Sequence, residues 1–427
     1  MRIFFKSFVA FGLLLALASA CNPVPRATVS PTVAAPAATA ISTQPPTAEI
    51  PAPAIAGLQM LDATNGWAWT SSNHLLRTTN GGQTWADRTP EGQVWLYGFF
   101  SLDPQNAWLP VFLPDSNRFG MLHTADGGLT WTQYPYGPAS NLHFTNTTNG
   151  WAKDTSVGAG NMFITLSETQ DGGATWTHTP ITPPQPEYGF PPGTLHLCSM
   201  CNDSFYYDPV RMVIISGDMA TMQPGGSVRM QISFDLGKNW QSQNLPLPKE
   251  EMDALVSPDQ AVFFDNNNGL LPVHLIKTNS DGSYMYQRLA LYRTQDGGAN
   301  WSLLPGVLDN AAPYTPMQIV SMNDIIVLCG NALCATHNGA QTWQTITSKL
   351  DFTQTDKRQL TSLDFIDANT GWVLLSEDDL TTLYKTVDGG ATWTQIKPLL
   401  AASTPPTTVI DDSIPTPTLI PTPTPEP

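Results

Sequence analysis

The sequence predicts an all-β fold: a single seven-bladed β-propeller of four-stranded antiparallel blades, with disordered N- and C-terminal tails. One observation is a turn motif ending in tryptophan, which occurs seven times between residues 78 and 393. A second is length, because 344 residues shared among seven units give about 49 per unit, the size of a four-stranded blade. The third is another turn motif that precedes most of these copies. Such units close most naturally into a ring, which protects their strand edges.

The first 20 residues have the features of an export signal. Arg2 and Lys6 precede a short apolar run from Phe8 to Leu17, which is too short to span a bilayer. Small residues at 18–20 then lead to Cys21, as at a bacterial lipoprotein processing site. We expect acylation of Cys21 and a protein on the outer face of the cell membrane. The alternative is ordinary cleavage that leaves a free thiol.

Two segments rich in proline and threonine flank the repeats. Residues 21–56 show no apolar periodicity, and residues 401–427 run through Pro-Thr-Pro-Thr. Segments of this composition bury too little apolar surface to offset the entropy cost of ordering. We therefore expect a lipid-anchored tether, a propeller at residues 57–400 and a disordered tail.

The charge balance disfavours several classes of partner. The chain has a net charge of −16 and only 19 Lys and Arg residues. Nucleic acids and anionic membrane surfaces are bound through clustered cations, so we expect neither as a partner. Membrane contact is expected through the lipid anchor only. We also expect a monomer without a cofactor or a metal.

The seven-fold motif reads Thr or Ser, any residue, Asp or Asn, two residues that are usually Gly-Gly, one variable residue, Thr or Asn, and Trp. Asp or Asn can accept hydrogen bonds from turn amides, Gly takes a positive φ without steric cost, and Trp covers the turn. Two copies are degraded, with Leu236 and Ala340 in place of Gly. We expect a structural role for the carboxylate or amide and for the tryptophan of each copy, which are Asn80 and Trp85, Asp126 and Trp131, Asp171 and Trp176, Asp235 and Trp240, Asp296 and Trp301, Asn338 and Trp343, and Asp388 and Trp393.

The second motif begins with Asp or Asn and ends, four residues later, in Gly-Trp or Ala-Trp. It starts at Asp62, Asp103, Asn146 and Asp367, with weaker forms at 265–270 and 323–326. It predicts a turn followed by a strand. In the first unit we expect four strands, at about residues 58–61, 67–70, 74–78 and 84–88.

These motifs resemble the Asp-box, or bacterial neuraminidase repeat, of sialidases, xyloglucan-degrading enzymes and sorting receptors. A single seven-unit ring with Asn-Gly-Trp before Thr-x-Asp-Gly-Gly-x-Thr-Trp is similar to the photosystem II stability and assembly factor family, over about residues 57–400. The resemblance implies a propeller that binds or assembles protein complexes, in photosynthesis for the photosynthetic members, here in an exported lipoprotein form. It is specific for fold rather than function, because the motifs are the blade-building residues. The arginine-rich patch of that family has no counterpart, since the eight arginines of residues 57–400 are dispersed.

A glycan-cleaving enzyme is the alternative within the same fold. A sialidase needs three arginines and a tyrosine–glutamate pair, and its Phe/Tyr-Arg-x-Pro motif is absent from the sequence. A xyloglucan-type hydrolase needs two catalytic carboxylates. Asp62, Asp103, Asp265 and Asp367 recur at one turn position of successive units, which favours a structural role. We therefore expect no catalytic residue.

Four cysteines form two local pairs. Cys198 and Cys201 make a C-x-x-C, and Cys329 and Cys334 bracket a Gly-Asn turn. In an exported protein two disulfides are the default, with three possible connectivities, and we expect the local one for Cys329 and Cys334. A zinc site that uses both pairs, or His196, is the alternative.

The fourth unit is long, and its excess length lies at Pro180–Pro209. Loops that interrupt a regular repeat often carry binding on a rigid scaffold. The candidate contact residues are aromatic, and the alternative is that they pack back onto the ring; they are Tyr188, Phe190, Phe205, Tyr206 and Tyr207.

The predicted function is an extracytoplasmic, lipid-anchored binding or assembly scaffold whose partner is a protein or protein complex. The alternative is a carbohydrate-binding or glycan-hydrolysing propeller, and a glycan remains a possible partner.

Overall fold

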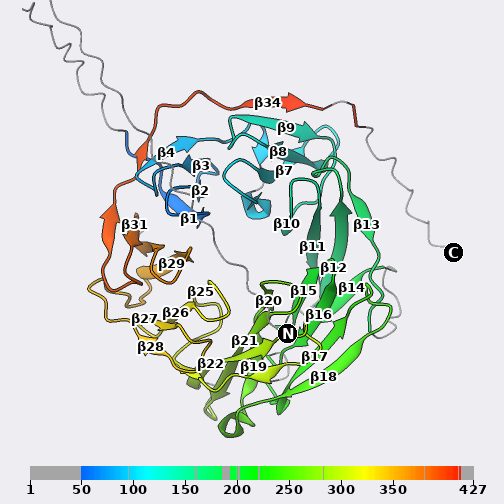
Figure 1. The fold of residues 1–427 in the computed structure, drawn as a ribbon, viewed down its shortest axis with the longest axis vertical. Coiled ribbons are helices and arrows are strands. Elements are labelled where there is room, and N and C mark those ends of the chain that lie inside the picture. The colour runs from blue at the N-terminus through cyan, green and yellow to red at the C-terminus, as the bar shows by residue number, and fades with distance from the viewer. Residues whose placement is uncertain are drawn as a thin grey trace, which may run out of the picture. The chain divides into compact units, whose positions relative to one another are not determined.

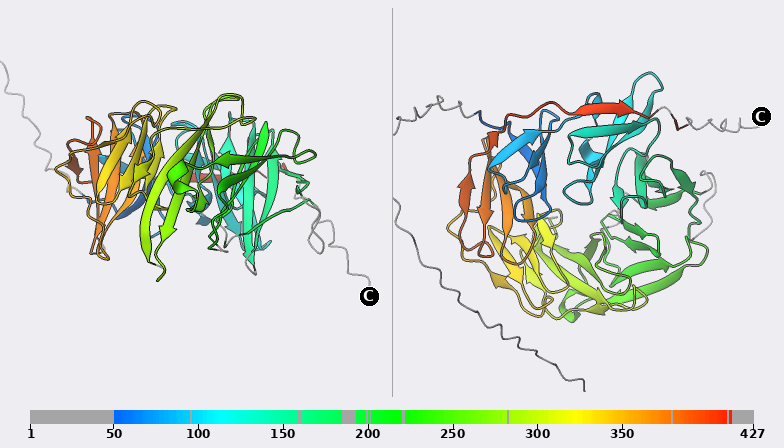
Figure 2. Two further views of the ribbon diagram at one scale, coloured as in Figure 1. Left: turned by 90° about the horizontal axis from the view of Figure 1, so that it is seen from below. Right: turned by 45° about the horizontal axis from the view of Figure 1, so that its top comes forward.

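The structure is a computed structural model that describes residues 50–414 except residues 95, 159–160, 185–192, 199, 201, 220–221, 282, 379 and 412. In this part of the chain seven β-sheets follow one another around a ring (Figure 1). Two further views show the sheets standing side by side (Figure 2). The predicted seven-bladed β-propeller is confirmed. The predicted signal peptide, Cys21 and nearly all of the predicted tether lie outside the described residues.

Each blade is built from one continuous stretch of antiparallel strands, with its first strand innermost in the ring, and blades 1 and 2 each gain one further strand from the C-terminal segment (Figure 1). The strands are, in blade 1, β1 (Ile55–Met60), β2 (Gly66–Thr70), β3 (Leu75–Thr78) and β4 (Thr84–Asp87); in blade 2, β5 (Gln93–Val94), β6 (Phe100–Ser101), β7 (Ala107–Leu113), β8 (Arg118–Thr124) and β9 (Thr130–Tyr134); in blade 3, β10 (Leu142–Phe144), β11 (Gly150–Gly158), β12 (Asn161–Thr169), β13 (Thr177–Thr179) and β14 (Leu195–Cys198); in blade 4, β15 (Ser204–Asp208), β16 (Arg211–Ser216), β17 (Ser227–Ser233) and β18 (Gln241–Pro246); in blade 5, β19 (Leu255–Pro258), β20 (Val262–Phe263), β21 (Gly269–Thr278), β22 (Tyr284–Thr294), β23 (Ser302–Leu303) and β24 (Leu308–Asp309); in blade 6, β25 (Met317–Ile319), β26 (Ile325–Cys329), β27 (Ala332–Thr336) and β28 (Gln344–Thr345); and in blade 7, β29 (Arg358–Phe365), β30 (Gly371–Glu377), β31 (Leu380–Thr386) and β32 (Thr394–Ile396).

The predicted strands of the first unit agree with β1 to β4 to within three residues. Among the described residues, helix is confined to short 3-10 turns such as η1 (Leu96–Gly98) and η3 (Lys249–Glu251). In the described part of the chain, no helix is long and apolar enough to cross a membrane.

The repeated box turns are closed by side chains in the way the sequence predicts. In blade 2 the Thr124 hydroxyl donates to Asp126 Oδ1 and accepts from the Gly128 amide, each over 2.9 Å. Asp126 Oδ1 also accepts from the Thr130 amide, 2.9 Å away. The same three hydrogen bonds recur in the other six copies. These turns fix the register of the two outer strands in every blade.

Apolar side chains fill the spaces between blades. The buried residues form seven hydrophobic clusters, and each cluster joins two neighbouring blades. The cluster between blades 7 and 1 contains Trp372 and Trp85, both fully buried. Trp372 also donates its indole N–H to the Gly81 carbonyl of blade 1, over 3.0 Å, as Trp108 of blade 2 does to Gly172 of blade 3, over 2.7 Å. The ring therefore closes through the same kind of contact that joins its other blades.

The C-terminal segment differs from the prediction of a disordered tail from residue 401. Here β33 (Leu399–Leu400) pairs in parallel with β4, and β34 (Thr407–Ile410) pairs in parallel with β9 (Figure 1). We call residues 399–411 the C-terminal strap. Its backbone satisfies the open outer edges of two blades, a pairing that depends little on side chains and is therefore invisible to composition. Residues 415–427 lie outside the described part.

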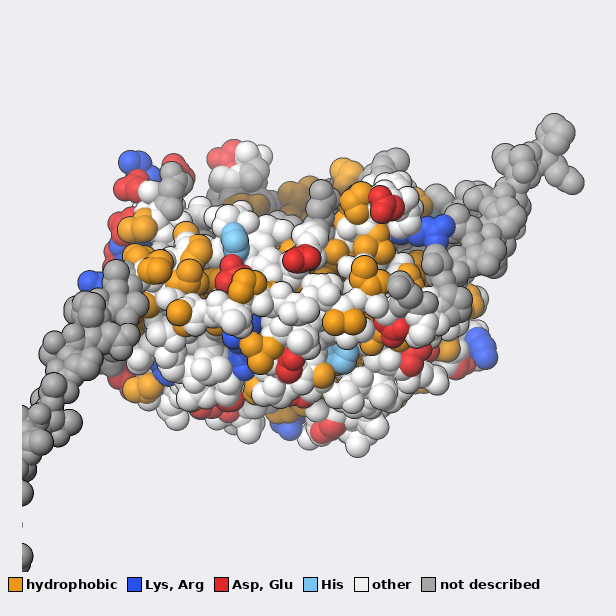
Figure 3. Space-filling view, turned by 90° about the horizontal axis from the view of Figure 1, so that it is seen from above, with side chains coloured by type: hydrophobic (Ala, Val, Ile, Leu, Met, Phe, Trp, Pro, Cys, Tyr) orange, Lys and Arg blue, Asp and Glu red, His pale blue; other side chains and the backbone are white. Residues whose placement is uncertain are grey.

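The strap crosses the outer wall of blades 1 and 2. The view onto the side of β34 shows hydrophobic side chains spread among other side chains and backbone, with charged groups between them (Figure 3). Backbone hydrogen bonds hold the strap at both ends, from the Leu399 amide to the Gln83 carbonyl and from the Asp411 amide to the Gln133 carbonyl, each 3.0 Å long. The strap thus ties blade 1 to blade 2 from outside.

Candidate binding face

Of the predicted contact aromatics, the three that the structure describes are buried or half-buried. Phe205 and Tyr207 lie on β15 with 3% and 4% of their surface exposed, and both pack into the cluster between blades 3 and 4. Tyr206 points the other way, and its ring lies 5.0 Å from that of Phe263 in blade 5. Because β15 is an innermost strand with neighbours on both faces, alternate residues are drawn into both interfaces. Phe205 and Tyr207 therefore pack onto the ring, which was the alternative to a role in partner contact. Tyr188 and Phe190 lie outside the described residues.

Asp203 joins two loops at the start of blade 4. Its carboxylate accepts hydrogen bonds from the Cys198 amide, over 3.1 Å, and from the Gly217 amide, over 2.9 Å. Burial raises the pKa of Asp203, although the two amides act against this shift. The end of the long insertion is thereby attached to the hairpin that connects β16 and β17.

Asp218 extends this attachment to blade 5. Its side chain is 2% exposed and accepts a hydrogen bond of 2.7 Å from Arg229. It also accepts from the amides of Gly225 and Val256, over 3.1 and 3.3 Å. A buried carboxylate is stable only when paired in this way. The hairpin of blade 4 is thus attached to the first strand of blade 5.

Glu251 makes the third attachment. It is 1% exposed, ends the η3 turn, and accepts hydrogen bonds from the Tyr286 hydroxyl and the Arg288 guanidinium of β22. Burial and the Glu251 hydrogen bond raise the pKa of Tyr286 to about 12. The connection between blades 4 and 5 is therefore fixed to the long β21–β22 hairpin.

These loops carry exposed apolar side chains. Because the strands of a blade alternate in direction, the loops leave the sheets at the end opposite the box turns. Five large apolar residues, three on these loops and two at the start of β22, are each 48–67% exposed, and we call this set the platform: Met200, Met222, Met252, Tyr284 and Met285.

A pocket of about 200 Å³ opens beside the innermost strands of blades 3 and 4. It includes Tyr206 and Tyr207 among its lining residues. The others that matter for its chemistry are Asn141, His143, Trp151, Lys153 and Gln260.

The carboxylates that could suggest hydrolysis are part of turns. Asp62 accepts hydrogen bonds from the amides of Thr64 and Asn65, each over 2.7 Å. Burial acts to raise the pKa of Asp62, but these hydrogen bonds outweigh it and hold the pKa well below its usual range. Asp103, Asp265 and Asp367 accept amide hydrogen bonds in the same positions. Such carboxylates brace the turn and are poor general acids.

Besides the Tyr286–Glu251 pair described above, a second tyrosine–glutamate pair occurs, between Tyr207 and Glu168. It lies between blades 3 and 4, and Tyr207 is almost fully buried. Burial, together with the Glu168 hydrogen bond, raises the pKa of Tyr207. A raised pKa disfavours the phenolate, so this pair is badly placed to act as a nucleophile.

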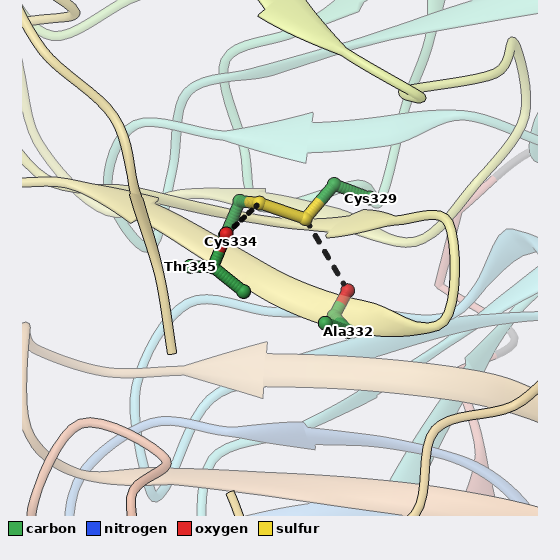
Figure 4. The surroundings of a disulfide bond; sticks show 4 residues. All are labelled: Cys329, Ala332, Cys334 and Thr345. Atoms are coloured by element: carbon green, nitrogen blue, oxygen red, sulfur yellow. Dashed lines mark hydrogen bonds between the residues drawn. A yellow bond between two sulfur atoms is a disulfide. The ribbon is translucent and has the colours of Figure 1, made fainter. Parts of the chain in front are cut away.

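Cys329 and Cys334 form a disulfide across the β26–β27 hairpin (Figure 4). This confirms the local pairing. Cys198 is also disulfide-bonded, while Cys201 lies outside the described residues. A sulfur engaged in a disulfide is not a zinc ligand, so a zinc site that uses both pairs is excluded. Within the described ranges, no cluster of three or more His, Cys, Asp or Glu side chains could hold a metal ion.

The sequence reasoning did not find the three carboxylates that organise this face. Asp203, Asp218 and Glu251 lie in loops with no shared spacing, and they meet their partners only after the blades have assembled. The one available signal was the length of two units. The spacing between box tryptophans is 64 residues between Trp176 and Trp240 and 61 residues between Trp240 and Trp301, against about 49 residues for an average unit. Those long units are the ones whose loops form the platform.

Comparison with solved structures finds other propellers. They include YCF48 bound to a D1 peptide, with 18% identity over 80% of this chain and 95% of that one and a TM-score of 0.43. YCF48 from Cyanidioschyzon merolae has 14% identity over 79% and 98% of the two chains, with a TM-score of 0.42. A polysaccharide lyase of family PL25, an ulvan lyase, has 9% identity over 81% and 96%, with a TM-score of 0.41. At these values the likenesses carry no argument about function. No family model and no curated protein matches the chain.

Proposed function

We propose that this protein is a binding scaffold whose partner is a protein that docks on the platform. One observation carries the proposal: five exposed methionine and tyrosine side chains stand on loops and a strand end that three buried or partly buried carboxylates hold in place. Exposed apolar side chains on a fixed support are typical of protein contact sites.

The chemistry of the platform indicates the kind of partner. Methionine is unbranched and polarisable, so its side chains can adapt to an apolar surface of irregular shape. Tyr284 supplies a rigid aromatic contact at low entropy cost. The protein has a net charge of −16, so a partner with apolar side chains flanked by Lys or Arg would be attracted, and an acidic one repelled.

The proposed setting rests on the sequence. A lipid on Cys21 would hold the protein on the outer face of the membrane, and residues 22–56 would let the propeller reach a partner nearby. Mass spectrometry of the mature N-terminus tests this, because a diacylglycerol-modified Cys21 is expected and an unmodified one would contradict it.

The test of docking is affinity capture from intact membranes with a double variant, Met222→Ser with Met252→Ser. We expect recovery of the partner to fall by about tenfold, since two exposed apolar contacts are removed. The control is Leu380→Ser with Val387→Ser, two side chains of blade 7 that are each 68% exposed. Equal loss in both double variants, or no loss in either, would contradict the platform proposal.

We further propose that the protein acts without catalysis, and glycan binding is the competing function. What supports our proposal is the bracing role of the turn carboxylates and the burial of the Tyr207–Glu168 pair. A glycan array and an assay of glycoside turnover separate the two. Turnover that is lost in Glu168→Gln would overturn the proposal.

A further inference from the structure

The pocket between the innermost strands of blades 3 and 4 contains a cation with no carboxylate to balance it. Lys153, on β11, donates a hydrogen bond of 3.2 Å from Nζ to the Phe205 carbonyl. In the described part of the chain, no carboxylate lies within 4.0 Å of Nζ. Burial lowers the pKa of Lys153, as expected where no carboxylate compensates it. An ammonium group has three donors, so it can still donate to a ligand.

The neighbouring carboxylates are engaged elsewhere. Asp154, next in the chain, accepts hydrogen bonds from the amides of Ala139 and Ser140, over 3.1 and 3.2 Å. Asp208 accepts from the Tyr206 hydroxyl over 2.7 Å and pairs with Arg211 over 3.2 Å. The positive charge of the pocket is therefore left to Lys153.

The rest of the lining suits a flat apolar group. Trp151 and Tyr207 are 7% and 4% exposed and provide an aromatic floor. Tyr206 also lines the pocket, and its hydroxyl is taken by Asp208. At the exposed rim, the Gln260 amide makes no hydrogen bond to a described residue and can donate to a ligand.

We propose that this pocket binds a single carboxylate attached to an aromatic or other flat apolar group, with Lys153 as the counter-ion. The volume of about 200 Å³ is below that of a drug-sized site and fits one side chain or one small ring. The net charge of −16 disfavours a polyanion, whereas a lone carboxylate needs only one cation. The ligand can be a free aromatic acid or an acidic side chain beside an aromatic one in a peptide. This proposal does not depend on the platform.

The test is isothermal titration calorimetry of the mature protein at neutral pH with three probes. Benzoate represents a free ligand, and benzamide is its neutral counterpart. A capped tripeptide with one central aspartate between two phenylalanines represents a peptide ligand. We expect at least one acidic probe to bind about tenfold more tightly than benzamide, because a charge-assisted hydrogen bond to Lys153 is available only to a carboxylate. The acidic probe that binds shows whether the ligand is a free aromatic acid or an acidic side chain in a peptide.

Two variants complete the test. Lys153→Met is expected to weaken binding of the acidic probe by about tenfold, and Lys277→Met, which removes a surface lysine of blade 5, to leave it within about twofold. If Lys153→Met does not fold, Lys153→Arg replaces it, and the comparison of benzoate with benzamide in the unaltered protein still decides. Equal affinity for benzoate, the tripeptide and benzamide, or no binding of either acid up to about 10 mM, overturns the proposal.

Discussion

At the scale of single residues, short polar side chains set the backbone of every blade. The box carboxylate or amide and the hydroxyl two residues before it hold a turn whose first Gly has a positive φ in the intact copies, such as 73° at Gly81 and 71° at Gly127. The degraded copies keep a positive φ without Gly, with 59° at Leu236 in place of the first Gly and 56° at Ala340 in place of the second. Residues with a Cβ are strained in this region.

Leu236→Gly is therefore expected to stabilise the protein. Relief of the left-handed strain should exceed the entropy that Gly adds to the unfolded chain, for a net gain of roughly 0.5–1 kcal/mol. Urea denaturation measures this. Leu129→Gly is the matched control, since Leu129 is an exposed residue of another box whose φ is not positive, and it should destabilise by a similar amount. Destabilisation by both changes would contradict the strain argument.

A second residue-scale prediction concerns pH. Burial raises the pKa of Asp364 from 3.8 to about 6, although the Met60 amide donates a hydrogen bond to its carboxylate. The folded state then holds a proton that the unfolded state has released, so the free energy of unfolding should fall as pH rises from about 4 to about 6. The loss from this group has an upper limit of about 3 kcal/mol.

Asp364→Asn isolates this group, because the amide oxygen can still accept from Met60 but does not ionise. Urea denaturation at several pH values should show the variant gaining stability relative to the unaltered protein between pH 4 and pH 6, and keeping that gain above pH 6. A difference that is the same at every pH would contradict the assignment.

At the scale of elements, the strap is the part of the chain that fastens blades 1 and 2. Truncation after residue 398 removes β33 and β34 and their backbone hydrogen bonds to β4 and β9. At roughly 1 kcal/mol for each net hydrogen bond, we expect a loss of about 3 kcal/mol in the free energy of unfolding. Truncation after residue 414 is the control and should change little. Equal stability of both truncated forms would show that the strap contributes nothing to the free energy of unfolding.

The elements also show where sequence reasoning succeeds and where it stops. The strands of blade 1 follow from its turns, because each turn is closed by residues within the same few positions of the sequence. The strap does not follow, because Pro- and Thr-rich chain gives no sign that its backbone will meet an open edge. The sequence predicts loop positions for Phe205 and Tyr207, but both belong to β15. Because side chains alternate between the two faces of a strand, both lie in the interface with blade 3.

At the scale of the whole molecule, the ring is predictable because a hydrophobic cluster of the same kind fills each interface between blades. Between blades 2 and 3, and between blades 7 and 1, an indole N–H also crosses to the next blade. The platform is not predictable, because Asp203, Asp218 and Glu251 find their partners only when separate loops meet. The same holds for Lys153, whose isolation from carboxylates is a property of the folded ring. Both proposed binding sites therefore lie on blades 3 to 5, outside the repeated box turns.

Cross-linking mass spectrometry on intact cells tests this account most directly, since it reports which part of the ring a partner touches. Lys249 and Lys277 lie beside the platform, whereas Lys385 and Lys397 lie on blade 7 and just after it. We expect cross-links to a partner protein to concentrate at Lys249 and Lys277. Cross-links confined to Lys385 and Lys397 would contradict the account.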